Sequence, residues 1–203
     1  MDNVTVNKEM KLSEHFKLGE MCKTSYHTTD GNIPSRVAIE NLRNLCENWL
    51  EDLRYSYNAL YGDVGEEDKR KFLDKPSGKA ERKGSSCVPS VASEQSSSNR
   101  SAQELKGQYS EIPVIISSGY RSEEVNRKCG GAKGSNHLTG CAVDIKCYGP
   151  EQMIRMAGIL LDIADGTKRD FDELILEKRG TTYWVHFAVR PKDNRRKILF
   201  DCR

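Results

Sequence analysis

The chain has 203 residues, enough for one domain with a sizeable core or for two smaller domains. Its 32 basic and 30 acidic residues nearly cancel, so its charge gives no indication of nucleic acid or an anionic membrane surface as partner. The hydrophobic content of 36% and the mean hydropathy of -0.69 are low for a fully compact domain, and we expect a solvated portion.

Nothing in the sequence predicts export or membrane insertion. There is no run of about eighteen apolar residues, and residues 1–9 lack the basic and apolar regions of a signal peptide. We therefore expect a monomer that is cytoplasmic as synthesised, without membrane insertion and without a nucleic-acid partner. The 7 cysteines include no C-x-x-C pair, which indicates reduced thiols rather than a disulfide framework.

The first predicted element is a helix that packs on the core. Residues 1–11 are polar, and we expect them to be disordered, with a single domain from 12 to 203. Pro34 precedes a pattern of apolar residues at three- and four-residue spacing, which predicts a helix over about 35–58. Its apolar face would consist of Val37, Ile39, Leu42, Leu45, Cys46, Trp49 and Leu53.

A segment rich in serine and charge interrupts the domain at about 62–108. It contains no aromatic residue between Phe72 and Tyr109. Such a composition cannot bury enough apolar surface to offset the entropy lost on ordering, so the sequence predicts a disordered insertion.

The second half of the chain alternates strands and helices. We predict the α+β class, with a small antiparallel sheet and helices packed on one of its sides. The predicted elements are a strand at 112–117, a helix capped by Ser122, a strand at 141–147, a helix from Pro150 to about Gly166, a hairpin of 171–177 and 182–189, and a final strand at 197–200.

The strongest candidate site combines His137, Asp144 and His186. Gly140 lets the chain turn sharply between the first two. Asp144 and His186 each lie in an apolar predicted strand, where an unpaired polar group is unfavourable unless it meets a cation. Two imidazoles and a carboxylate are typical of a three-ligand zinc site with an open fourth position. A buried His–Asp hydrogen bond is the alternative interpretation.

A hydrolytic zinc site also needs a base and a polarising cation. Glu173 and Glu177, on the predicted hairpin, are the candidates for the base. If the hairpin closes around residues 179 and 180 without a bulge, Glu173 lies opposite His186, which favours Glu173. Arg121 follows the strand at 112–117 and suits a carboxylate or a developing oxyanion.

Several motifs occur together in this chain. They are Ser118-Gly119-Tyr120-Arg121 with Asn126, the pattern S-x-H-x-x-G-x-A-x-D from Ser135 to Asp144, Trp184-Val185-His186, Phe16-x-Leu18-x-Glu20-Met21, and Asn41-Leu42-x-x-Leu45. This combination resembles the zinc D-Ala-D-Ala carboxypeptidase family, in its carboxypeptidase-like branch. That family includes D,D-dipeptidases and phage L-alanyl-D-glutamate endopeptidases, which cut peptidoglycan stem peptides. The resemblance covers most of the chain outside 62–108.

The resemblance implies a hedgehog-like zinc fold and roles for individual residues. His137, Asp144 and His186 would bind one Zn²⁺ ion, and Arg121 would contact the substrate or transition state. The substrate-binding residues would be Arg121, Ser135 and Trp184.

The catalytic base is where the chain departs from the resemblance. The best-known members carry the catalytic glutamate three residues before the last histidine, where this chain has Tyr183. The related hedgehog signalling domain has a run F-D-x-x-x-x-E before its last zinc histidine, and Phe171-Asp172 to Glu177 matches that run. By this resemblance Glu177 is the base and Glu173 the second choice.

The implied function is that of a zinc metallopeptidase acting on the peptides of the bacterial cell wall. It would be a D-Ala-D-Ala carboxypeptidase or a related endopeptidase, similar to a phage endolysin, with a peptidoglycan peptide as substrate. A phage or prophage origin would explain how it reaches the wall. The alternative is an inactive, zinc-stabilised module that binds cell wall or protein, which the absence of a glutamate at Tyr183 favours.

Overall fold

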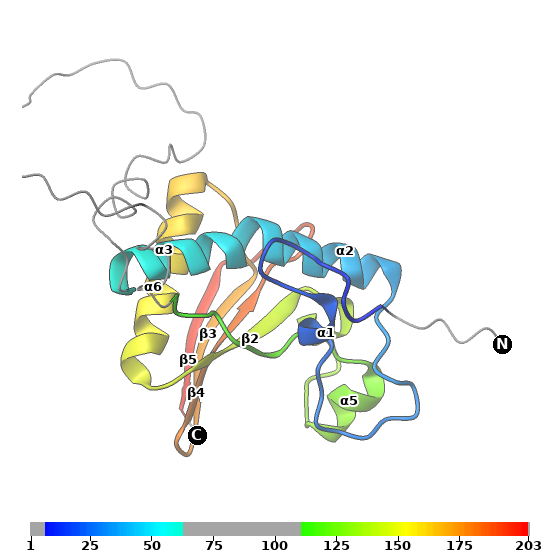
Figure 1. Cartoon of the computed structure of the whole chain (residues 1–203). Helices are drawn as coiled ribbons and strands as arrows, with labels where there is room; N and C mark the ends of the chain where they lie inside the picture. Colours follow the sequence, from blue (N-terminus) through cyan, green and yellow to red (C-terminus); the bar gives the residue numbers. More distant parts are fainter. Residues whose placement is uncertain (1–6, 63–110, 203) are drawn as a thin grey trace, which may run out of the picture.

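The computed structural model describes residues 7–62 and 111–202 (Figure 1). The predicted insertion at 62–108 lies outside the described residues except for Gly62, and so do residues 1–6. Contacts begin before residue 12, where the domain was expected to start. The amides of Leu18 and Gly19 donate to the carbonyls of Met10 and Lys8, each at 2.9 Å.

Five strands form one sheet in the order β1-β2-β4-β3-β5. Neighbouring strands are antiparallel except for β3 and β5, which are parallel. The α+β class with helices on a sheet is confirmed, and the strands that carry Asp144 and His186 are antiparallel as expected, while β5 joins the edge of the sheet in parallel. Residues 189–196 keep the chain at the end of the sheet where β4 finishes and β3 begins, so β5 starts beside the first residue of β3. The strands are β1 (Ile116–Ser118), β2 (Ala142–Cys147), β3 (Glu173–Arg179), β4 (Thr182–Ala188) and β5 (Lys197–Cys202).

The predicted helix at 35–58 is present as one continuous rod (Figure 1). Ser35 caps it by accepting a hydrogen bond from the amide of Ala38 at 3.2 Å. The rod consists of α2 (Arg36–Leu45), a π-helical turn η1 (Cys46–Leu50) and α3 (Glu51–Tyr61). The other helices are α1 (Leu18–Met21), α5 (Glu123–Lys128), the 3₁₀ turn η3 (Asn136–Thr139) and α6 (Pro150–Thr167). No helix in the described ranges is long and apolar enough to cross a membrane.

The rod and α6 pack on the same face of the sheet. The rings of Trp49 and Phe187 lie 5.0 Å apart, which joins η1 to β4, and α6 contributes buried residues such as Met156 and Leu160 to the same core. The opposite face is left for polar side chains, because residues alternate between the two faces along each strand.

Two apolar helical residues are exposed, Val37 of the predicted apolar face and Ile154 of α6. Val37 is 64% exposed and Ile154 is 59% exposed. Val37 lies in the first turn of α2, which passes over η3 rather than over the sheet, and there the carbonyl of Ala38 lies close to Gly140. The helical pattern was therefore correct, but the core ends before the helix does.

The β3–β4 hairpin has a register two residues away from the predicted one. Arg179 pairs with Thr182, so the loop is Gly180-Thr181 rather than Arg179-Gly180. Gly180 has a φ of 59°, and a glycine with positive φ at the first loop position is what a two-residue hairpin of type II′ requires. As a result Ile175, not Glu173, lies opposite His186.

Gly140 allows η3 to approach α2. It has a φ of 70°, and a Cβ atom there would lie 2.3 Å from the carbonyl oxygen of Ala38. We expect Gly140→Ala to lower the free energy of unfolding by about 2 kcal/mol or more, measured by urea denaturation. Gly158→Ala is the control, because Gly158 lies inside α6 with open space around it. That change should raise stability by about 0.5–1 kcal/mol. Equal effects of the two changes would contradict the close approach.

Candidate metal centre and active site

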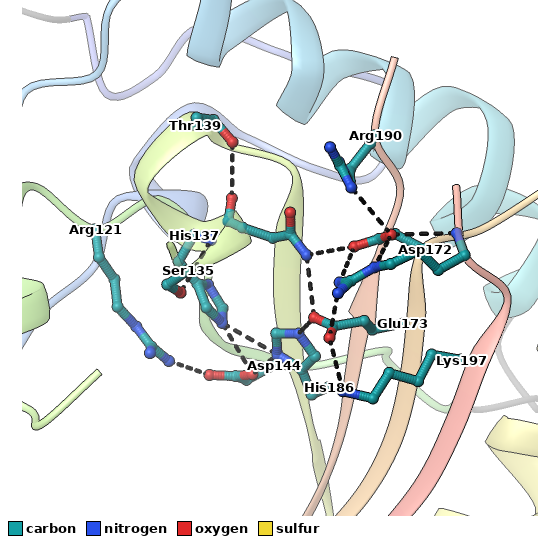
Figure 2. A network of polar contacts seen from close by, with 12 residues as sticks. Arg121, Ser135, His137, Thr139, Asp144, Asp172, Glu173, His186, Arg190 and Lys197 are labelled. Atoms are coloured by element: carbon teal, nitrogen blue, oxygen red, sulfur yellow. Dashed lines mark hydrogen bonds and ion pairs between the residues drawn. The ribbon is translucent and has the colours of Figure 1, made fainter. Parts of the chain in front are cut away.

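Three buried polar side chains meet on the sheet face away from the helices. His137 comes from η3, while Asp144 and His186 are directly paired across β2 and β4. Their exposed fractions are 2%, 7% and 8%. His186 Nδ1 lies 2.9 Å from Asp144 Oδ1, and His137 Nε2 lies 3.2 Å from each of those atoms (Figure 2). The predicted trio is therefore brought together, around one point.

The triangle formed by these three atoms fits a zinc ion. A tetrahedral zinc ion with bonds of about 2.0–2.1 Å holds its ligand atoms about 3.3 Å apart. The observed separations of 2.9 and 3.2 Å are close to that value. Within the described residues these three are the cluster of His, Cys, Asp and Glu side chains able to hold a metal ion.

Each histidine uses its second ring nitrogen for another contact. His137 Nδ1 lies 2.6 Å from the carbonyl oxygen of Gly119, so Nδ1 carries the hydrogen and Nε2 presents its lone pair to the centre. His186 Nε2 lies 3.7 Å from Glu173 Oε2. Outer contacts of this kind, to a backbone carbonyl and to a carboxylate, fix the tautomer and orientation of histidines that ligate metals.

The electrostatics of the centre also favour a cation. Burial alone would raise the pKa of Asp144, but the charges and hydrogen bonds of His137 and His186 hold that pKa well below its usual range. Burial lowers the pKa of His137. Burial would lower the pKa of His186 as well, but its bonds to Asp144 and Glu173 raise it to about 9. Three electron-rich atoms thus face one point, and a proton or a metal ion at that point would compensate their negative charge.

Arg121 lies at the edge of this centre, after β1. Its Nε donates to Ser118 Oγ at 2.8 Å, and its Nη2 forms an ion pair with Asp144 Oδ2. A guanidinium has five N–H donors, so further donors remain for a substrate group. Ser135, expected to bind substrate, forms a hydrogen bond within the protein: its Oγ accepts from the amide of His137 at 3.3 Å.

A family model described as Peptidase M15 matches residues 78–167. The match supports the M15 peptidase family. The matched residues include Arg121, His137 and Asp144. His186 lies beyond the match, so its assignment as the third candidate ligand, expected in a zinc-dependent family, rests on the geometry. No curated protein matches the chain significantly.

Glu173, one of the two candidate bases of the M15-like site, is held by several partners. Asn136 Nδ2 donates to its Oε2 at 3.0 Å, while Arg195 Nη2 and Lys197 Nζ lie 2.9 and 3.6 Å from its Oε1. The hydrogen bond with His186, opposed by burial and helped by the charge of Arg195, lowers the pKa of Glu173 to about 2. A carboxylate bound in this way is a weak proton acceptor.

Glu177 has the opposite environment. It lies opposite Trp184 on the same sheet face, and Ile175 separates it from Glu173 along β3. Burial and the charge of Asp144 raise the pKa of Glu177. Its side chain forms no hydrogen bond or ion pair within the part of the chain that the structure describes. A half-buried carboxylate with a raised pKa and no partner is suited to accept a proton.

Tyr183 lies on the other side of the sheet from the site. It is three residues before His186, and side chains alternate between faces along a strand, so Tyr183 packs against the core. A glutamate at this position in this strand would not reach the metal ligands.

Sequence reasoning missed the polar network behind Glu173 (Figure 2). Asp172 is fully buried and accepts hydrogen bonds from Asn136 at 2.7 Å and from Arg195 at 2.7 and 2.8 Å. Arg190 Nη1 lies 3.6 Å from Asp172. No local pattern indicates this network, because Arg190 and Arg195 are remote in sequence from Asp172.

Removing one of the candidate metal ligands tests whether the site binds zinc. We expect His137→Ala and His186→Ala to lower zinc affinity by more than about 100-fold, since the loss of an outer contact alone lowers metal affinity by about 10–100-fold. Zinc content and zinc-dependent thermal stability measure this effect. His27→Gln, at an exposed histidine, is the control. Unchanged zinc content in both ligand variants would rule out the site.

Asp172 should make stability depend on pH. Burial would raise its pKa, but bonds from Arg195 and Asn136 outweigh burial and lower the pKa to about 2. A carboxyl group with a depressed folded-state pKa stabilises above its unfolded value, near 4, and this stabilisation is lost as pH falls towards 2. We expect Asp172→Asn to destabilise by about 1–2 kcal/mol at pH 7, because water screens the half-exposed Arg195.

Urea unfolding at several pH values provides the measurement. The difference in stability between the wild type and Asp172→Asn should shrink as pH falls from about 4 to about 2, because protonation removes the carboxylate charge from the wild type too. A difference that stays constant across this range would contradict the assignment.

Proposed function

We propose that this protein is a zinc metallopeptidase that hydrolyses peptidoglycan stem peptides, as a D-Ala-D-Ala carboxypeptidase or a related endopeptidase. The observation that carries the proposal is the buried triangle of His137, Asp144 and His186, whose dimensions fit zinc. The M15 family match supports peptidase chemistry. The choice of peptidoglycan as substrate rests on the family resemblance.

The proposed mechanism divides hydrolysis among residues of the same sheet face. A bound zinc ion would supply Lewis acidity, which polarises the scissile carbonyl and lowers the pKa of water. Glu177 would accept the proton of the attacking water as the new C–O bond forms. It would then pass that proton to the leaving amine as the C–N bond breaks. Arg121 would donate hydrogen bonds to the developing oxyanion or to a substrate carboxylate.

Glu173 would orient His186 and would not itself transfer a proton. Its contact with His186 and its bonds to Asn136 and Arg195 hold the imidazole in place. This division supports Glu177 as the base and leaves Glu173 as a positioning residue. Trp184, opposite Glu177 on β4, would form part of the substrate-binding surface.

The second function considered, an inactive zinc-stabilised binding module, loses its main support. That hypothesis depended on Tyr183 standing where related enzymes carry a glutamate. Tyr183 faces the core, so a glutamate at this position of β4 would point away from the candidate site. Assays of turnover separate the two functions.

Glu177→Gln should remove hydrolysis and keep zinc. We expect the rate on purified muropeptides to fall by at least about 100-fold, the usual contribution of a general base. The released amino acids or peptides are followed by mass spectrometry, with and without a chelator, and zinc content is measured in parallel. Glu14→Gln, at an exposed glutamate, is the matched control.

Glu173→Gln should behave differently. We expect zinc affinity to fall by about 10–100-fold, as for other outer contacts of a metal ligand, and added zinc to restore hydrolysis. If Glu173→Gln were inactive at saturating zinc while Glu177→Gln kept its activity, the roles would be reversed. Absence of product from the wild-type protein under every metal condition would favour the binding module.

A further inference from the structure

The two edges of the sheet are built differently. β1 has only 3 residues and an irregular register between Ile116 and Ser118, and short, irregular edge strands are a common way to prevent further strand pairing. β5, at the other edge, has 6 residues, contains no proline and pairs with β3 in an unbroken parallel register. Within the described residues no strand covers its outer side, so β5 is open to another strand.

The outer edge also carries apolar side chains. Ile198, Leu199 and Phe200 are 45%, 40% and 71% exposed. Ile198 and Phe200 pair with Leu174 and Leu176 of the core, so they lie on the sheet face that the helices cover, yet they extend beyond the helices. A regular edge strand with exposed apolar residues is a surface on which a further strand can add.

The backbone groups that face outward are those of Ile198 and Phe200. The amide of Lys197 donates to the carbonyl of Asp172, just before β3, at 2.9 Å. Residues along a strand direct their backbone groups alternately to one side and the other, so Lys197 and Leu199 bond to β3. The N–H and C=O groups of Ile198 and Phe200 therefore point away from β3, towards any strand that is added.

The sequence of β5 is complementary to itself. Around Leu199 it reads Lys-Ile-Leu-Phe-Asp, with a cation and a carboxylate at equal distances from the centre. Two copies of β5 paired antiparallel about Leu199 would set Lys197 of each copy opposite Asp201 of the other. Ile198 of each copy would lie opposite Phe200 of the other. Opposite charges, and an aromatic residue facing a β-branched one, are favourable cross-strand pairs.

The backbone selects the same register. In an antiparallel ladder, two residues that exchange backbone hydrogen bonds must both face the partner strand. Ile198 and Phe200 meet this condition when the pairing is centred on Leu199. A shift of the pairing by one residue would set an outward residue opposite an inward one, and a shift by two would separate Lys197 from Asp201. Charge and backbone thus agree on one arrangement.

We propose that β5 is a dimerisation edge, on which a second copy of this chain adds its own β5 antiparallel about a twofold axis at Leu199. Two five-stranded sheets would then form one continuous sheet. Lys197 lies 3.6 Å from Glu173 and keeps donors for Asp201 of the second copy, since an ammonium has three. The sequence alone led us to expect a monomer, because this charge pattern forms a contact only on an edge strand. The proposal does not depend on the peptidase function.

Sedimentation of the full chain at increasing concentration tests whether a dimer forms. We expect the average mass to rise from 23.0 kDa towards twice that value. Amide hydrogen exchange locates the contact, because Ile198 and Phe200 should become protected as the concentration rises. Leu199 is the internal control, since its amide faces β3 and should be protected in monomer and dimer alike.

A charge at the most exposed apolar position of β5 should weaken the dimer. We expect Phe200→Lys to raise the dissociation constant by about tenfold, the combined effect of losing both cross-strand pairs with Ile198. Phe200 is 71% exposed, so the variant should fold, and thermal unfolding checks this. Tyr148→Lys is the matched control and should associate like the wild type. Tyr148 is 73% exposed and follows β2, which β4 and β3 separate from β5.

Two charge-reversed variants test the register. Lys197→Asp alone and Asp201→Lys alone would each bring like charges together in their own dimers, and we expect each to associate about tenfold more weakly. An equimolar mixture restores opposite charges at both positions, so the mixed dimer should form about as readily as the wild-type dimer. Mixing would not repair a change within one copy, such as the lost contact of Lys197 with Glu173. Native mass spectrometry with one variant ¹⁵N-labelled identifies the mixed dimer.

Several results would overturn the proposal. A wild type that stays monomeric up to about 1 mM would do so, because even a weak specific complex forms at that concentration. Protection of the Ile198 and Phe200 amides in the monomer would show that another part of this chain covers the edge. A dimer that Phe200→Lys leaves intact would place the contact on another surface. Failure of the two charge-reversed variants to associate when mixed would exclude the register centred on Leu199.

Discussion

The site depends on one cross-strand pair, Asp144 opposite His186. A carboxylate buried in a sheet is unfavourable unless a cation or hydrogen-bond donors compensate it, and here two imidazoles and Arg121 surround it. Register fixes the pair, because a slip of one residue between β2 and β4 would turn one of the two side chains into the core. The apolar residues that alternate with them, including Val143 and Phe187, thus hold the ligands in place by occupying the opposite face.

The two glutamates of β3 illustrate how environment separates groups of the same chemistry. Glu173 and Glu177 lie on one face, on either side of Ile175, which pairs with His186. The hydrogen bond with His186 and the charge of Arg195 lower the pKa of Glu173, whereas burial and the charge of Asp144 raise the pKa of Glu177. Of these neighbours, Arg195 comes from the turn before β5 and adds to the difference between the two glutamates.

That turn connects several features of the fold. By returning the chain to the outer edge of β3, it makes β5 parallel and brings Arg190 and Arg195 over the buried Asp172. The same two arginines line a groove that the first turn of α2 and η3 complete. The segment 190–196 is therefore part of the support for the candidate metal centre, through the contact of Arg195 with Glu173.

The sequence by itself determined most of the elements and the candidate trio of His137, Asp144 and His186. Local patterns carry that information: apolar spacing defines the rod and α6, Ser122 caps α5, and the polar residues Asp144 and His186 are conspicuous inside apolar strands. Only the tertiary structure decided which glutamate is free, where Tyr183 points, and why Val37 is exposed. Those properties depend on hairpin register, on strand direction and on contacts between residues far apart in the chain. Residue spacing alone does not specify them, because the positive φ of Gly180 sets the register and the 189–196 connection sets the neighbours.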